Sequence, residues 1–107
     1  MPTPPASTKS SLTSRLHAHA ARRWPQLDVQ VRFRGAFAYI DGQLGDDPPF
    51  PLCRLRYGGQ ASNWGFALYL YSSERYEEQV LPTGDYAGSP EEALDCACGL
   101  YLAAPEA

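Results

Sequence analysis

Hydrophobic and polar residues alternate along four short stretches of the chain, and a two-residue period is typical of strands that bury one face. The stretches are 28–34, 37–42, 52–57 and 64–71. Gly35 and Ala36 separate the first two and fit a two-residue hairpin turn with glycine first. A proline-containing loop follows the second stretch, and two glycines follow the third. The pattern predicts a four-stranded antiparallel sheet, to which 78–81 can add a short edge strand.

Two further stretches repeat apolar residues every three or four positions, as one face of a helix does. The first covers 11–24, and Pro25 ends it because the residue before a proline disfavours helical backbone. Its apolar positions are Leu12, Leu16, Ala20 and Trp24. The second covers 90–102, where Ser89 can cap the first turn and Pro90 fits the first helical position. The order of helix, four strands and helix predicts an α+β fold, with both helices packed on one face of the sheet.

The chain has 107 residues, of which 44% are hydrophobic and 20% are charged, and this composition suits one globular domain. Residues 1–9 are rich in Pro, Ser and Thr, so we expect a disordered tail followed by a single α+β domain over 10–107. No apolar run approaches the roughly 20 residues that cross a bilayer. The N-terminus also lacks the apolar stretch of a signal peptide. These features predict a cytoplasmic protein with no membrane partner.

With both helices on one face, the other face of the sheet is left open. A two-residue turn sets Arg34 opposite Phe37, and directly opposed residues share a face. The same face would carry arginines from the third strand and tyrosines from the fourth. The expected binding residues are Arg32, Arg34, Phe37, Tyr39, Arg54, Arg56, Tyr69 and Tyr71. Gly65 and Ala67 would form a shallow floor between the tyrosines.

An exposed surface of arginine and aromatic side chains has three interpretations. Arginine forks bind phosphates and base edges, and exposed rings stack on unpaired bases, which favours nucleic acid. Arginine and tyrosine are also enriched at the centres of protein interfaces, which favours a protein partner or a homodimer. In the third interpretation the surface is only structural, with arginine stems covering tyrosine rings and arginine heads pairing with Glu74, Glu77 or Glu78. The sequence predicts a small non-enzymatic binding module and leaves these interpretations open.

The charges are divided unequally along the chain. Residues 1–73 contain eight Lys or Arg and four Asp or Glu, a net charge of +4, whereas 74–107 have a net charge of −7. The total of −3 and the isoelectric point near 5.2 weaken the case for a strong non-specific nucleic-acid binder. The basic first part still permits a local and specific site.

Residues with catalytic or metal-binding chemistry are few and poorly spaced. His17 and His19 are two positions apart, so they point in different directions on a helix. Cys53, Cys96 and Cys98 do not form a CxxC motif, and buried apolar thiols are common. We therefore expect no catalytic residue, no metal site and no cofactor, and we expect the thiols to be reduced and mostly buried.

Parts of the sequence resemble known families. The segment from Gly88 to Leu94, Gly-Ser-Pro-Glu-Glu-Ala-Leu, and the helix that continues to Leu102 resemble the C-terminal helix of Hic-type antitoxin domains. This resemblance implies an antitoxin-like regulatory domain with a protein partner or a homodimer interface. The segments 24–59, 64–67 and 94–101 are similar to small uncharacterised actinobacterial proteins, which implies no activity. The helix–sheet–helix order also resembles double-stranded-RNA-binding domains, and this implies the fold class alone.

Overall fold

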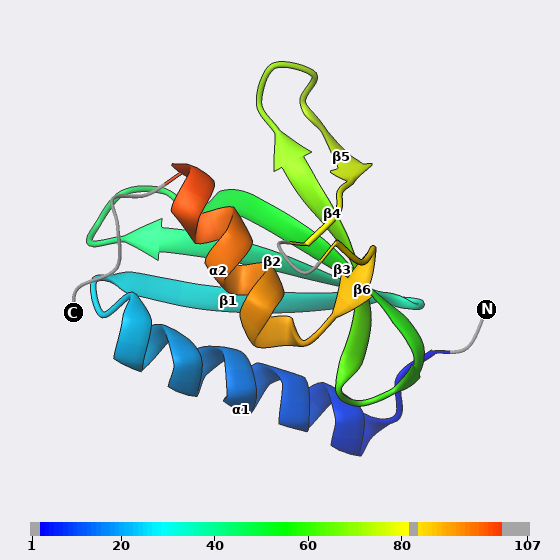
Figure 1. The fold of residues 1–107 in the computed structure, drawn as a ribbon. Helices are drawn as coiled ribbons and strands as arrows, with labels where there is room; N and C mark the ends of the chain where they lie inside the picture. The colour runs from blue at the N-terminus through cyan, green and yellow to red at the C-terminus, as the bar shows by residue number, and fades with distance from the viewer. Residues whose placement is uncertain (1–2, 82–83, 102–107) are drawn as a thin grey trace.

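The computed structural model describes residues 3–81 and 84–101, and within them the chain forms two helices and six strands (Figure 1). In chain order they are α1 (Ala6–Arg23), β1 (Leu27–Arg34), β2 (Phe37–Leu44), β3 (Phe50–Gln60), β4 (Asn63–Leu70), β5 (Arg75–Glu78), β6 (Ala87–Gly88) and α2 (Pro90–Tyr101). The α+β class and the position of the sheet between the two helices in the sequence are confirmed. The expected four-stranded sheet is extended by two short strands, β5 and β6. Neither helix has the length and apolar character needed to cross a membrane.

The six strands form one antiparallel sheet in the order β1-β2-β3-β4-β5, with β6 also paired to β4. The edge strand expected at 78–81 lies a few residues earlier, because β5 begins at Arg75. Two additional strands form because the outer edge of β4 has backbone groups that need hydrogen-bond partners. The amide of Phe66 donates to the carbonyl of Tyr86 (3.1 Å), and the amide of Gln79 donates to the carbonyl of Phe66 (3.3 Å). The returning chain therefore covers this edge.

The β1–β2 hairpin and a bulge in β3 set the register of the sheet. Gly35 takes the first turn position with a φ of +59°, a conformation that residues with a Cβ rarely adopt. A bulge next to Ile40 leaves Leu52 of β3 without a partner on β2. Leu52 and the following Cys53 are therefore both buried. The strict alternation expected over 52–57 begins only at Cys53.

Both helices pack on the same face of the sheet, as expected (Figure 1). The apolar stripe of the first helix is buried at Leu12, Leu16, Ala20 and Trp24. The buried residues of α2 include Ala93, Leu94, Ala97 and Cys98. Leu100, which the apolar pattern of α2 also assigns to the core, is 57% exposed. Residues 1–2 of the expected tail and Leu102 of the expected helix lie outside the described residues.

The first helix begins earlier than its apolar stripe indicates. α1 starts at Ala6, so residues 6–9 are helical and are not part of a disordered tail. Prolines are tolerated directly before a helix because the first amides have no acceptor within it, and Pro5 stands at that position. The ammonium of Lys9 lies 5.5 Å from the ring centroid of Phe33. This tertiary contact ties the first turns to the sheet, which composition alone does not reveal.

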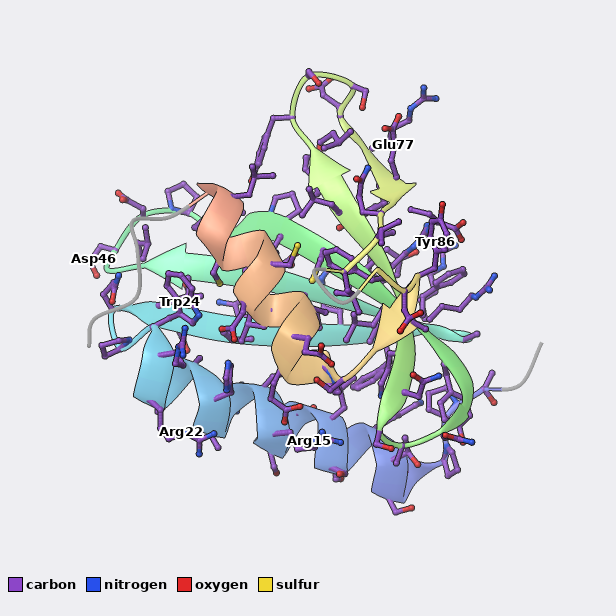
Figure 2. The ribbon with its side chains drawn as sticks, in the orientation of Figure 1. Arg15, Arg22, Trp24, Asp46, Glu77 and Tyr86 are labelled. Atoms are coloured by element: carbon purple, nitrogen blue, oxygen red, sulfur yellow. The ribbon has the colours of Figure 1, made fainter. Side chains whose placement is uncertain are left out.

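Polar contacts join the two helices along one side. Arg15 of α1 donates two hydrogen bonds to the carboxylate of Glu91, at 2.8 and 2.7 Å. One turn further, Oδ1 of Asp95 lies 2.8 Å from Nε2 of His19 and accepts a bond of 3.0 Å from the indole of Trp24. Burial raises the pKa of Glu91, but the bonds from Arg15 outweigh this effect and hold the pKa below its ordinary value. The partners advance in the same direction on both helices, which therefore run in the same general direction, with α2 inclined to α1 (Figure 2).

Candidate functional site

The open face is the face of the sheet turned away from α1 and α2. Two rows of paired residues cross it from β1 through β2 to β3. The rows are Arg34–Phe37–Arg56 and Arg32–Tyr39–Arg54. The face continues through Gly65, Ala67 and Tyr69 on β4 and through Tyr76 and Glu78 on β5. The register confirms the expectation that the four arginines share one face.

Two tyrosines differ from the sequence-based expectation. Tyr71 lies beyond the end of β4, where its hydroxyl donates to the carbonyl of Pro51 at 2.9 Å and its ring contacts Tyr69. The sequence does not predict Tyr76 at the site, because the edge strand that it predicts, at 78–81, begins after this residue. Alternation along the correct strand places Tyr76 on the open face.

Five aromatic rings form a continuous row of contacts across the open face. Their centroids are 6.3 Å apart for Phe37–Tyr39, 5.4 Å for Tyr39–Tyr76, 5.1 Å for Tyr76–Tyr69 and 4.9 Å for Tyr69–Tyr71. Tyr39 lies on β2 and Tyr76 on β5, so their contact requires the sheet to curl toward its open face. Burial, together with the nearby carboxylate of Asp41, raises the pKa of Tyr76 to about 12. Its hydroxyl is therefore neutral at ordinary pH.

Two of the four arginines are held by contacts within the open face. The guanidinium carbon of Arg54 lies 4.4 Å from the ring centroid of Phe37 and 5.5 Å from that of Tyr76. Arg32 donates to both carboxylate oxygens of Asp41, at 3.0 and 3.4 Å, and these bonds raise the pKa of Arg32. None of these partners is a glutamate named in the structural interpretation. Arg32 and Arg54 therefore have the intramolecular contacts that the structural interpretation expects, but the partners are Asp41, Phe37 and Tyr76 and not a glutamate.

Arg34 and Arg56 are different, because both are exposed and neither has a carboxylate partner among the described residues. Phe37 lies between them in the register. Neighbouring strands are about 4.8 Å apart, so the two arginines begin about 10 Å from each other across two strand spacings. This corner of the open face presents two guanidinium groups on either side of an aromatic ring.

A hollow of about 200 Å³ lies beside this corner. It is lined by residues that include Phe37, Arg54, Arg56, Gly65, Ala67, Glu78 and Tyr86. Gly65 and Ala67 form its floor, because Gly65 has no side chain and Ala67 has only a methyl group, whereas the residues on the neighbouring strands are longer. The expected floor is therefore present, but its border includes Tyr86, beside β6 (Figure 2). A second depression of about 460 Å³ borders Arg32, Phe33, Arg34, Tyr39 and Tyr76.

The open face as a whole is only weakly positive. The register and the alternation along each strand also place Asp28, Asp41 and Glu78 on it. Asp41 is engaged by Arg32, whereas Asp28 lies at the opposite end of β1 from Arg34. Positive charge therefore concentrates at the corner around Phe37. Such a distribution suits a short local contact with an anion better than a long basic track.

The three cysteine thiols are largely buried, and His17 contacts the backbone. Cys53 and Cys98 are buried and Cys96 is half-buried, and all three are free thiols. Burial raises the pKa of each thiol, that of Cys98 to about 12. Nε2 of His17 lies 2.8 Å from the carbonyl oxygen of Val29. Across residues 3–81 and 84–101, no three His, Cys, Asp or Glu side chains are grouped so that they could hold a metal ion.

No family model, curated protein or solved structure matches the chain. The resemblances to antitoxin helices and to small actinobacterial proteins therefore stay predictions.

Proposed function

We propose that the protein is a small non-enzymatic module that binds single-stranded nucleic acid on its open face. The observation that carries this proposal is the corner formed by Arg34, Phe37 and Arg56 beside a ring-lined hollow. Single-strand binding needs cations for the phosphates and flat rings for the bases, and this corner supplies both.

Arg34 and Arg56 supply the phosphate contacts. Arginine is permanently charged and presents a planar fork that matches the geometry of phosphate oxygens. Both side chains are exposed, and no carboxylate within the described residues competes for them. Arg54 adds a third positive charge from its position on the ring of Phe37. The site therefore contacts two or three phosphates of a strand that crosses the sheet.

The aromatic side chains supply the base contacts. Tyr86 is 65% exposed and stands at the border of the hollow, so one face of its ring can take a base. Phe37 borders the same hollow, and the guanidinium of Arg54 lies against its ring. Stacking of a base on an aromatic ring contributes about 1–3 kcal/mol, which suits a small site that binds a few nucleotides.

A second candidate function is a protein interface, either with a partner, as in an antitoxin-like regulatory domain, or with a second copy of the chain. The row of five aromatic rings favours it, because tyrosine and arginine are among the residues enriched at interface centres. The exposed corner around Phe37 favours nucleic acid, since a protein partner would have to neutralise Arg34 and Arg56 with carboxylates of its own.

Fluorescence anisotropy with short labelled single strands of DNA and RNA at low salt tests the proposal. Arg56→Ala should weaken binding about tenfold, the size of one charge-assisted contact. The matched control is Arg22→Ala, which removes the same charge from an exposed position on α1 (Figure 2). Its affinity should stay within about twofold of the wild type, because that position is remote from the site.

Three results would overturn the nucleic-acid proposal. The first is an absence of binding to any strand at low salt. The second is an equal loss of affinity in Arg56→Ala and Arg22→Ala, which would mean that only net charge matters. The third is a dimer in sedimentation that dissociates in Arg56→Ala without nucleic acid, which would assign the open face to the second candidate function.

A further inference from the structure

The hollow on the open face has walls of opposite hydrogen-bonding character. In the register, Ala67 of β4 is paired with Arg54 of β3 on one side and with Glu78 of β5 on the other. Strands are about 4.8 Å apart, so the two walls begin about 10 Å from each other. Arg56 stands beside Gly65 in the next row and extends the arginine wall. An arginine side chain can only donate hydrogen bonds, and an ionised glutamate can only accept them.

The two walls do not neutralise each other. No ion pair joins Glu78 to Arg54 or Arg56, or to any other cation in the described parts of the chain. Gly65 and Ala67 place no side chain larger than a methyl group between the walls, and both line the hollow. A ligand that fills the hollow must therefore present acceptors toward the arginines and donors toward the glutamate.

We infer that the hollow is a base pocket that prefers guanine, an inference that rests on the proposed single-strand binding. Guanine carries the acceptors O6 and N7 on one edge, which match the forks of Arg54 and Arg56. Its N1–H and N2 amino group are donors on the neighbouring edge, which match the carboxylate of Glu78. The rings of Phe37 and Tyr86 border the same space and contact the base faces.

The other bases fit these walls less well. Adenine has a donor beside N7, where the arginines need an acceptor, and its N1 would direct a lone pair at Glu78. Cytosine can donate to Glu78 through N4 but has no second donor. Guanine alone among the bases offers two adjacent acceptors to the arginines and two adjacent donors to the glutamate, whereas thymine and uracil have a single ring donor, N3–H. The pocket thus adds base preference to a site whose arginines otherwise contact phosphates.

The test compares short thymine-rich single strands that differ at one central position, which is guanine, inosine, adenine or cytosine. The wild type should bind the guanine strand about tenfold more tightly than the adenine strand, the usual effect of one bidentate base contact. Inosine lacks the N2 amino group and should fall between them. Glu78→Gln should remove most of the guanine preference and leave the affinity for the all-thymine strand unchanged or slightly higher.

Glu77→Gln is the matched control, because Glu77 precedes Glu78 and is paired with the core residue Leu68, so it lies on the other face of β5. It should keep the full preference for guanine. A second measurement needs no variant: guanosine monophosphate should shift the backbone amide signals of Gly65 and Ala67 in an NMR titration more than adenosine monophosphate does.

The outcomes separate the pocket from the proposed function. Equal binding of the guanine and adenine strands, with clear binding of both, overturns the guanine pocket and leaves single-strand binding intact. A preference that persists in Glu78→Gln also overturns it, because the carboxylate would then play no part. An absence of binding to every strand overturns both proposals. Loss of the preference in Glu78→Gln, with its retention in Glu77→Gln, supports the pocket.

Discussion

Arg54 and Arg56 stand two residues apart on the same strand and have different surroundings. Arg54 lies against two aromatic rings, whereas Arg56 is exposed at the edge of the hollow. The alternation of the sequence predicts that both point to the open face, and they do. It does not predict their partners, because Tyr76 reaches Arg54 from a strand that is distant in the sequence. The arginines of the open face therefore divide into those held by rings or carboxylates, as Arg54 is, and those without such a partner in the described residues, as Arg56 is, and both kinds border the hollow.

This difference predicts unequal effects on stability. Arg54→Ala should lower the free energy of unfolding by about 1–2 kcal/mol, since it removes two cation–π contacts and the packing of the arginine stem. Arg56→Ala should change it by less than about 0.5 kcal/mol, as exposed substitutions usually do. Urea denaturation of both variants and the wild type measures these changes in the free energy of unfolding. Equal losses in the two variants would contradict the division of the arginines.

Tyr76 predicts a specific dependence of stability on alkaline pH. Its pKa rises from an ordinary value of 10.0 to about 12 in the folded protein. Between these values the unfolded chain has lost the proton that the folded chain keeps, so the free energy of unfolding falls as the pH rises. Tyr76→Phe keeps the ring and removes the titrating group, so its stability should fall less steeply over this range.

The comparison is made by urea denaturation at several pH values. The thiols, whose pKa values are also raised, act in the same direction in both proteins and do not obscure the difference. The same pH slope for wild type and Tyr76→Phe would show that the phenol is not buried by the aromatic row.

At the scale of elements, the sequence predicts the parts of the fold that local patterns control. The β1–β2 hairpin follows from alternation and from Gly35, and the start of α2 follows from Ser89, whose hydroxyl and amide both bond to Glu92. Other features depend on contacts that are distant in the sequence. The early start of α1 depends on packing of its first turns, and β5 and β6 form because β4 has an edge to cover. The bulge at Leu52 interrupts alternation, and its local sign is Pro51, because proline within a central strand is confined to the start of the strand or to a bulge.

Two glycines of the sheet, one on β2 and one on β4, should respond differently to the same substitution. A Cβ on Gly42 would lie 2.7 Å from Cδ1 of Leu27 and 3.1 Å from Cδ1 of Leu52, both in the core. Gly42→Ala should therefore cost about 1–3 kcal/mol of stability through overpacking. Gly65→Ala meets its nearest atom at an ordinary 3.5 Å and should be nearly neutral. Thermal unfolding of the two variants checks this, and a neutral Gly42→Ala would contradict the packing described at that point.

At the scale of the whole molecule, the sequence predicts only part of the candidate site. Seven of the eight expected site residues lie on the open-face strands, and the exception is Tyr71, in the turn after β4. The sequence also predicts the small floor at Gly65 and Ala67. It does not predict that Glu78 and Tyr86 border this floor, because their positions depend on how the chain returns to the edge of β4. The curl that brings Tyr76 over the face is likewise a property of the assembled sheet.

The net charge of −3 limits how the whole molecule can bind an anion. General attraction to a polyanion is weak, so affinity must come from the few contacts of the local corner. Each neutralised phosphate of a single strand contributes about −0.7 to the slope of log K against log salt concentration. Two or three contacts therefore predict a slope of roughly −1.4 to −2.1, much shallower than that of a protein with an extended basic surface.

The most direct test is the salt dependence of the affinity of the wild type for a short all-thymine strand, in which no guanine engages Arg54 or Arg56 and both can contact phosphates. The account predicts measurable binding at low salt and a slope of roughly −1.4 to −2.1. It also predicts that Arg34→Ala and Arg56→Ala each make the slope shallower by about 0.7, while Arg22→Ala leaves it unchanged. An absence of binding at low salt, or a slope that none of these variants changes, would contradict the assignment of the open face to nucleic acid.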